Sequence, residues 1–296
     1  MKKLIVLAIA ATFMAVLPMT AASANETESG DWVYVSVGDS VAAGTQDPDP
    51  FTDDGYTDAL YRMLQRRMGL TEHVNFACPA DDTNEVIDGD DGPEGGSLCY
   101  GTDAPFGFGD TSQLATTVEY LEAHEGEIAL ITITLGANDL LRCADPTPEC
   151  VTEVVGNASY NLQATILPAL KAAAPGVPIV AMNYYNPNLA YWLVPGGEEI
   201  AAGSNQLVVA SNQVLADAYG AYGIPVADVA GAFRVYDERG RDVPVNVMVT
   251  CVYTSMCSWD DGSWQLAENP DIHPNDLGYR RIAWEFIRTM RQAGIR

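Results

Sequence analysis

Four short polar segments contain the residue types of an acyl-transfer site. Ser40 and Asn138-Asp139 each follow an apolar run, Pro79-Ala80-Asp81 follows another, and His273 precedes the last amphipathic segment. A hydroxyl becomes a nucleophile when an imidazole takes its proton. Backbone N–H groups and a side-chain amide stabilise the oxyanion of a tetrahedral intermediate. The segments therefore supply a nucleophile, a general base and oxyanion donors, provided that the fold brings them together.

The hydrophobic pattern predicts strands that alternate with helices. The strands are expected at 32–37, 73–78, 128–135, 177–185 and 224–229, and the helices at 56–68, 113–124, 160–173, 204–222 and 274–293. Such alternation is typical of an α/β fold with a mainly parallel sheet covered on both faces. Sites in such sheets form beyond the carboxyl ends of the strands, where the four polar segments lie. No repeat or linker divides the chain, so we expect one domain over 32–296.

Motifs for other chemistries are missing from the positions where they would be needed. No GxGxxG follows the first strand, and the chain has no P-loop and no HExxH. The residues around Ser40 do not form the GxSxG elbow, which disfavours an ordinary α/β-hydrolase.

The composition restricts the partners. The chain has 296 residues, with 40 Asp and Glu against 15 Lys and Arg, and a net charge of −25. A surplus of this size argues against nucleic acid and against attraction to anionic lipid. Partners or substrates should therefore be neutral, cationic or apolar. For the acyl-transfer site we predict a neutral or apolar ester substrate, and we expect no stable membrane insertion and a monomer. Residues 46–58 hold five acids and 81–103 hold eight, with no Lys or Arg in either stretch, which predicts a negative rim around the site.

The first 24 residues have the pattern of a secretory signal peptide. Lys2-Lys3 precedes an apolar run over 4–20, and Ala22-Ser23-Ala24 offers small residues for cleavage. The alternative is an uncleaved helix that anchors the protein in a membrane, but this apolar run is short for crossing a bilayer. We expect a secreted protein with a short tail over 25–31 ahead of the domain.

The six cysteines are expected to form disulfides, because an even count in an exported chain is typical of them. Six cysteines allow 15 connectivities, and the economical choice joins neighbours along the chain: Cys78 with Cys99, Cys143 with Cys150, and Cys251 with Cys257. Zinc binding is disfavoured by the lack of CxxC pairs and by only three histidines. We predict no metal and no cofactor, with calcium at Asp88-Gly89-Asp90-Asp91 as a minor alternative.

Three ordered blocks resemble a known family. Gly38-Asp39-Ser40, Gly136-Ala137-Asn138-Asp139 and Asp271-Ile272-His273-Pro274 look like the blocks of the SGNH (GDSL) hydrolases. The stretches 75–83, 182–187 and 271–279 are similar to its secreted bacterial lipase and esterase branch, and the resemblance spans 32–293. It implies a three-layer α/β/α sandwich with a flavodoxin-like, five-stranded sheet, and an esterase that needs no cofactor.

The resemblance also implies roles for single residues. Ser40 would be the nucleophile and His273 the general base, while the N–H groups of Ser40 and Ala80 and the amide of Asn138 would form the oxyanion hole. Two positions depart from the family. Ala80 stands where Gly is usual, and a backbone donor survives that change unless the site needs a positive φ. The acid usually lies three residues before the histidine, where this chain has Pro270.

Asp271, two residues before His273, has three possible roles: orienting the imidazole by its carboxylate, orienting it by its main-chain carbonyl, or none, which would leave a Ser–His dyad. Helix capping is the alternative role for Ser40 and explains Asp139 well. The function predicted is hydrolysis of carboxylic esters through an acyl-enzyme. The alternatives are a sugar O-deacetylase and an inactive binding protein on the same fold, and the acyl length stays open.

Overall fold

A computed structural model describes residues 31–89, 98–100, 107–143, 146–240 and 242–296. The signal peptide predicted over 1–24, and residues 25–30 of the tail predicted after it, lie outside these ranges. None of the described helices is both long and apolar enough to cross a membrane.

A five-stranded parallel sheet forms the centre of the molecule. Its strands are β1 (Trp32–Gly38), β2 (Leu70–Asn75), β3 (Ile128–Thr134), β4 (Ile179–Met182) and β5 (Val226–Ala227). Their spatial order is β2-β1-β3-β4-β5, and every pairing is parallel. This order confirms the predicted flavodoxin-like sheet. In such a sheet β2 is added on one side of β1 and the later strands on the other, which makes a topological switch point between β1 and β3.

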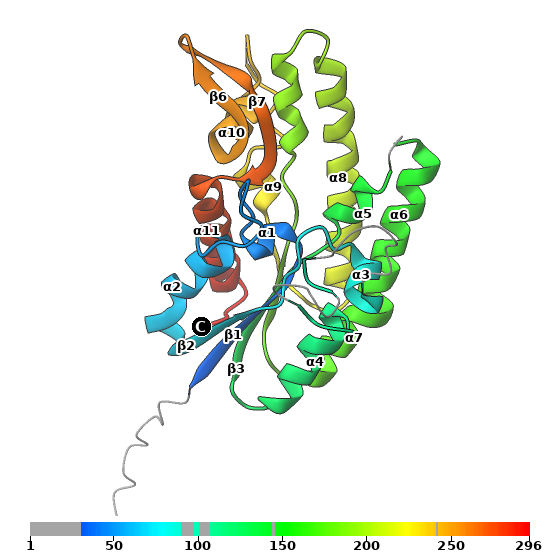
Figure 1. Cartoon of the computed structure of the whole chain (residues 1–296), viewed down its shortest axis with the longest axis vertical. Helices are drawn as coiled ribbons and strands as arrows, with labels where there is room; N and C mark the ends of the chain where they lie inside the picture. Colours follow the sequence, from blue (N-terminus) through cyan, green and yellow to red (C-terminus); the bar gives the residue numbers. More distant parts are fainter. Residues whose placement is uncertain (1–30, 90–97, 101–106, 144–145, 241) are drawn as a thin grey trace, which may run out of the picture.

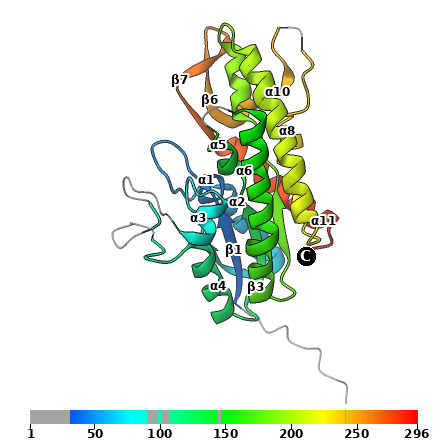
Figure 2. The ribbon, with the colours of Figure 1, turned by 90° about the vertical axis from the view of Figure 1, so that its right-hand side faces the viewer.

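Helices cover the sheet on both sides (Figures 1 and 2). On one side, α2 (Tyr56–Met68) packs against α11 (Asp276–Gln292). The other layer contains α4 (Gln113–Ala123), α6 (Pro148–Asn161), α7 (Leu167–Ala173) and α8 (Glu198–Gly220). The predicted three-layer sandwich is therefore confirmed, and β1, β3 and β4 are buried because they lie between the layers.

Two predicted boundaries shift for identifiable reasons. The strand expected at 73–78 lies at Leu70–Asn75, because its pairing with β1 starts at Leu70. The helix expected at 160–173 is the end of a longer helical run that begins at Pro148 and passes through a π-helical turn at Leu162–Ile166. Thr147 caps its start by accepting a hydrogen bond from the N–H of Cys150, and proline is favourable at the first helical position.

A second, two-stranded sheet was not predicted from the sequence. The antiparallel hairpin of β6 (Thr254–Asp260) and β7 (Ser263–Pro274) lies beyond the carboxyl end of the main sheet (Figure 1). It packs on α10 (Val245–Tyr253) and on the 3-10 helix η2 (Pro187–Leu193). Its second strand carries His273 towards α11.

All three expected disulfides are present. They join Cys78 to Cys99, Cys143 to Cys150 and Cys251 to Cys257, so the pairing of neighbours along the chain is confirmed. None of these six cysteines lies in the five-stranded sheet. Each disulfide instead joins segments beyond its carboxyl end.

Candidate active site

Ser40 is the first residue of the short helix α1 (Ser40–Ala43), directly after β1. The N-cap of that helix is Asp39, whose carboxylate accepts a hydrogen bond from the N–H of Val41 at 2.9 Å. Capping therefore does not explain Ser40. The preceding Gly38 is required sterically, because a Cβ there would lie 2.6 Å from the carbonyl oxygen of Thr134 on β3.

One apolar cavity brings together three of the predicted site residues. Ser40, Asn138 and His273 line it, and the apolar side chains of Val41, Leu215 and others complete its walls. Asn138 comes from α5 (Ala137–Leu141), the short helix after β3. The residue before this helix, Gly136, has φ +114°, and a Cβ there would lie 2.6 Å from the side chain of Leu215. This glycine lets α5 start close to α8.

The carboxylate of Asp271 holds the imidazole of His273. The Oδ1 atom of Asp271 lies 2.6 Å from Nδ1 of His273 and accepts the backbone N–H of His273 at 3.1 Å. Its Oδ2 atom accepts the N–H of Asp47 at 3.2 Å. Burial alone would raise the pKa of Asp271, but the hydrogen bonds from His273 and Asp47 lower it below its usual value. Of the three roles left open for Asp271, the geometry favours orientation by the side chain.

The imidazole of His273 is thus oriented by Asp271, and its Nε2 atom has no hydrogen-bond partner among the described residues. Within the described residues, His273 and the hydroxyl of Ser40 share no hydrogen bond. Such contacts are often long before substrate binds.

The three groups predicted as oxyanion donors each keep a hydrogen without an acceptor in the described residues. The N–H of Ser40 has no intrahelical acceptor because it is at the first helical position. In the described part of the chain no acceptor pairs with the N–H of Ala80. The amide of Asn138 donates one hydrogen to the carbonyl of Asp81 at 2.9 Å and keeps a second. Ala80 is exposed, is not among the residues lining the cavity, and has φ +73°, a conformation that normally favours glycine.

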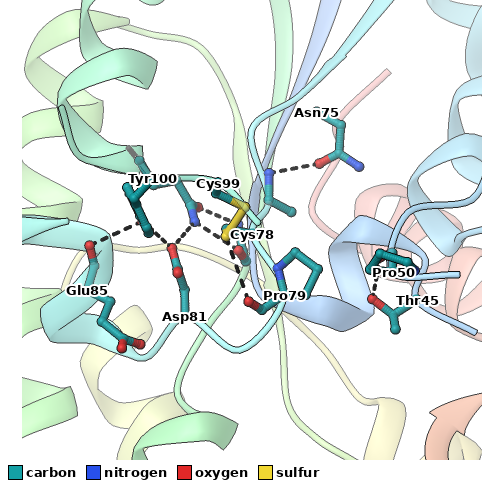
Figure 3. Close-up of a disulfide and its surroundings, with 12 residues drawn as sticks. Thr45, Pro50, Asn75, Cys78, Pro79, Asp81, Glu85, Cys99 and Tyr100 are labelled. Atoms are coloured by element: carbon teal, nitrogen blue, oxygen red, sulfur yellow. Dashed lines mark hydrogen bonds between the residues drawn. A yellow bond between two sulfur atoms is a disulfide. The ribbon is translucent and has the colours of Figure 1, made fainter. Parts of the chain in front are cut away.

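A buried polar network fixes the loop that contains Ala80 (Figure 3). The carboxylate of Asp81, only 4% exposed, accepts hydrogen bonds from Tyr100 Oη at 2.5 Å and from Gln113 Nε2 at 2.8 Å. Gln113 also bonds both the N–H and the carbonyl of Gly38. The disulfide of Cys78 with Cys99 brings Tyr100 to this loop. Burial raises the pKa of Asp81 to about 8, although both hydrogen bonds oppose the shift.

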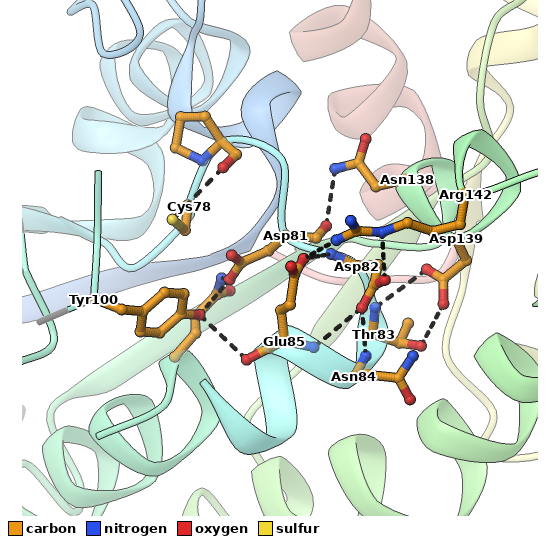
Figure 4. Close-up of polar contacts among 12 residues, drawn as sticks. Cys78, Asp81, Asp82, Thr83, Asn84, Glu85, Tyr100, Asn138, Asp139 and Arg142 are labelled. Carbon is orange, nitrogen blue, oxygen red and sulfur yellow. Dashed lines mark hydrogen bonds and ion pairs between the residues drawn. The ribbon is translucent and has the colours of Figure 1, made fainter. Parts of the chain in front are cut away.

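Within the described residues, part of the predicted negative rim is neutralised (Figure 4). Four of its acids lie outside the described ranges: Asp90, Asp91, Glu94 and Asp103. Arg142, which follows α5, pairs with Asp82 at 2.8 Å and with Glu85 at 2.6 Å on α3 (Thr83–Asp88). Both acids also form the capping box of that helix. Residues 81–103 contain no Lys or Arg. Only the tertiary structure therefore shows that Arg142 neutralises part of their negative charge.

Asp139 does not cap its own helix. It lies inside α5, and its carboxylate accepts the hydroxyl of Thr83 at 2.6 Å and the N–H of Thr83 at 3.2 Å. Burial raises the pKa of Asp139 to about 6. Asp139 therefore joins α5 to α3, and this contact positions Asn138 next to Asp81.

Sequence reasoning missed Tyr184 and Asn212. Tyr184 Oη donates to the second carboxylate oxygen of Asp39 at 2.5 Å, and the amide of Asn212 on α8 bonds both the N–H and the carbonyl of Tyr184 at 2.8 Å. Burial raises the pKa of Asp39 to about 6, although the hydrogen bond from Tyr184 opposes this shift. Tyr184 lies in the stretch 182–187 that carried part of the resemblance, whereas nothing in the sequence marked Asn212.

The described residues contain no group of three or more His, Cys, Asp or Glu side chains placed to hold a metal ion. Asp90 and Asp91, part of the alternative calcium segment, lie outside the described ranges.

Comparison with known proteins points to one family. The model of the GDSL-like lipase/acylhydrolase family matches residues 36–281. No curated protein matches the chain.

Three solved structures share the fold. The lipase Lip_vut3 from a goat rumen metagenome is 16% identical, with a TM-score of 0.53 over 89% of this chain and 98% of that one. A GDSL-like lipase from Parabacteroides merdae is 13% identical, with a TM-score of 0.53 over 90% and 97%. A variant of an acetyl xylan esterase from Geobacillus stearothermophilus is 15% identical, with a TM-score of 0.50 over 90% and 96%.

Proposed function

The chain belongs to the GDSL-like lipase/acylhydrolase family, and from that membership we propose that it hydrolyses carboxylic esters through an acyl-enzyme on Ser40. The observation that carries the proposal is the pairing of Asp271 with His273 Nδ1 at the rim of a cavity that Ser40 and Asn138 also line. This arrangement leaves Nε2 of His273 to act on the serine hydroxyl.

The reaction proceeds in two halves. His273 takes the proton of Ser40 as its oxygen attacks the ester carbonyl carbon, and the carbonyl oxygen becomes an oxyanion. The N–H groups of Ser40 and Ala80 and the amide of Asn138 stabilise this charge. The intermediate collapses, and His273 protonates the leaving alcohol. Water then attacks the acyl-enzyme, and His273 accepts its proton. When this second intermediate collapses, His273 returns the proton to the oxygen of Ser40 and the carboxylic acid leaves.

The ionised state of Asp271 supports this role for His273. Burial raises the pKa of Asp271, but the hydrogen bonds from His273 and Asp47 outweigh it and lower that pKa. The carboxylate is therefore charged at neutral pH and stabilises the imidazolium that forms in each half-reaction. We also propose that the protein is exported, because disulfides persist in oxidising compartments and three are present here.

Labelling with a fluorophosphonate tests the proposal directly. The reagent should modify the native protein, and Ser40→Ala should abolish labelling together with hydrolysis of p-nitrophenyl esters. Ser258→Ala, which removes an exposed hydroxyl on the hairpin, is the control and should retain both. Failure of the native protein to be labelled or to cleave any ester would refute the proposed function.

A further inference from the structure

The cavity beside Ser40 continues into a second hollow between α5 and α8. Four residues line both: Leu140, Leu141, Asn188 and Val208. The two hollows therefore form one groove that begins at Ser40 and leads away from it along α8.

One face of α8 forms a long wall of this groove. The lining residues of α8 include a set at helical spacing: Ile200, Gly203, Leu207, Val208, Ser211 and Leu215. The other four are polar: Glu199, Ser204, Gln206 and Asn212. From Ile200 to Leu215 this face extends about 22 Å, at a rise of about 1.5 Å per residue. An acetyl group would occupy only the end beside Ser40, whereas an extended alkyl chain would use the full length.

The groove has the surface chemistry of an alkyl site. Leu141 is 56% exposed and Ile200 is 55% exposed, so two large apolar side chains face water at its edges. Such exposed apolar surface typically marks a binding site for an apolar ligand. Among the described residues that line the second hollow, only Glu199 is charged, and it lies next to Ile200 at the far end; Asn188, Ser204 and Gln206 are neutral.

Contacts within the chain hold both walls of the groove in place. Asn212 anchors α8 through its two hydrogen bonds to Tyr184, whose hydroxyl bonds Asp39 beside the nucleophile. On the other wall, the disulfide of Cys143 with Cys150 ties the end of α5 to α6. A preformed groove binds a flexible chain at a lower entropic cost.

The starting point of the groove at Ser40 assigns it to the acyl half of the ester. In the acyl-enzyme the acyl group is bonded to the oxygen of Ser40, so an alkyl chain attached to that group can extend directly into the groove. Resting on the proposed acyl-enzyme at Ser40, we propose that the groove between α5 and α8 binds the acyl chain of long-chain fatty esters. Val208, at the junction of the two hollows, determines how far that chain extends.

A series of p-nitrophenyl esters tests the proposal, because the alcohol stays constant from acetate through butyrate and octanoate to palmitate. For the native protein, kcat/KM should rise by at least about tenfold from acetate to octanoate, since each methylene in an apolar pocket adds to discrimination. Val208→Trp should narrow the junction and remove most of that rise. Val209→Trp is the matched control, because Val209 lies next in sequence, is 37% exposed and does not line the groove.

A second variant covers the case in which Val208→Trp does not fold. Leu141→Asp places a carboxylate beside the alkyl chain at an exposed position, and it should lower the octanoate-to-acetate ratio as well. The groove proposal is wrong if native activity falls steadily with chain length, or if the Val208 and Val209 variants give the same profile. Either result leaves the proposed function intact, whereas cleavage of no ester would overturn that function itself.

Discussion

The two sides of the active site are built differently. On the base side, one carboxylate orients one imidazole, and both lie near the surface at the end of the hairpin, with side chains 14% and 16% exposed. On the oxyanion side, Asp81 is buried, and Tyr100, Gln113, Asn138 and a disulfide all fix its loop. On the first side the imidazole has one side-chain partner, whereas on the second the carboxylate has two and its loop is also held by an amide and a disulfide. Single substitutions should therefore affect them unequally.

The largest effect is expected on the base side. Asp271→Asn should lower kcat by about 10⁴-fold, because the amide donates where the carboxylate accepts and so favours the wrong tautomer of His273. Steady-state kinetics with a p-nitrophenyl ester would measure it. Asp276→Asn, an exposed change nearby on α11, is the control. A loss below about tenfold would mean that His273 works without Asp271 and that the site is a dyad.

A smaller loss is expected from one donor on the oxyanion side. Asn138→Ala should lower kcat by about 10²–10³-fold, the usual cost of removing one such donor. Asn161→Ala is a matched control, because its amide bonds Thr83 and Asn84 on the same side but does not line the cavity. Equal losses for the two variants would show that Asn138 acts only by holding the loop.

The buried network should make stability depend on pH. Because the pKa of Asp81 is raised to about 8 in the folded state, the stability that its protonated form contributes is present at low pH and lost as pH rises through 8. Between about pH 7 and pH 9 the loss should be on the order of 1 kcal/mol. Asp39 and Asp139, with pKa values raised to about 6, lose their contributions at lower pH.

Thermal unfolding across that pH range would measure the effect. Asp81→Asn, whose oxygen still accepts from Tyr100 and Gln113, should flatten the dependence, while the exposed control Asp110→Asn should keep it. Parallel curves for native protein and Asp81→Asn would show that Asp81 is ionised throughout.

The smallest effect concerns the backbone of Ala80. An L residue in the left-handed region is strained, so Ala80→Gly should raise the free energy of unfolding by up to about 1 kcal/mol. Ala80→Val should lower it, because a branched side chain tolerates φ +73° less well. Chemical denaturation would measure both. Equal stabilities for the three proteins would indicate an ordinary backbone conformation at this position.

The sequence predicted the candidate nucleophile and base better than the residues that hold the site in place. Ser40 and Asn138 could be predicted as candidates because each lies just after a strand of the parallel sheet, where the strand ends meet. His273 could be predicted because it precedes the last helix. The network around Asp81 could not, because Tyr100 is 19 residues away and Gln113 is 32 residues away along the chain. Such contacts depend on loop paths that no local pattern encodes.

The hairpin was missed although it had a local signal, because Asp261-Gly262 lies between two strands of aromatic and polar residues, as is typical of a tight turn. Asp271 was identified as a candidate, but no local signal distinguished its three possible roles. Across a spacing of two residues, the carboxylate of Asp271 reaches Nδ1 of His273 because the backbone turns there. The same carboxylate oxygen then also accepts the N–H of His273, and no sequence pattern encodes this turn.

The placement of the disulfides separates folding from activity. One ties down the oxyanion loop, one the groove wall at α5, and one the base of the hairpin that carries His273, whereas the central sheet contains no cysteine of these pairs. A reduced chain should therefore assemble its core and still lack an ordered site. Oxidation would then act as a maturation step, and a molecule retained in a reducing compartment would be folded but dormant.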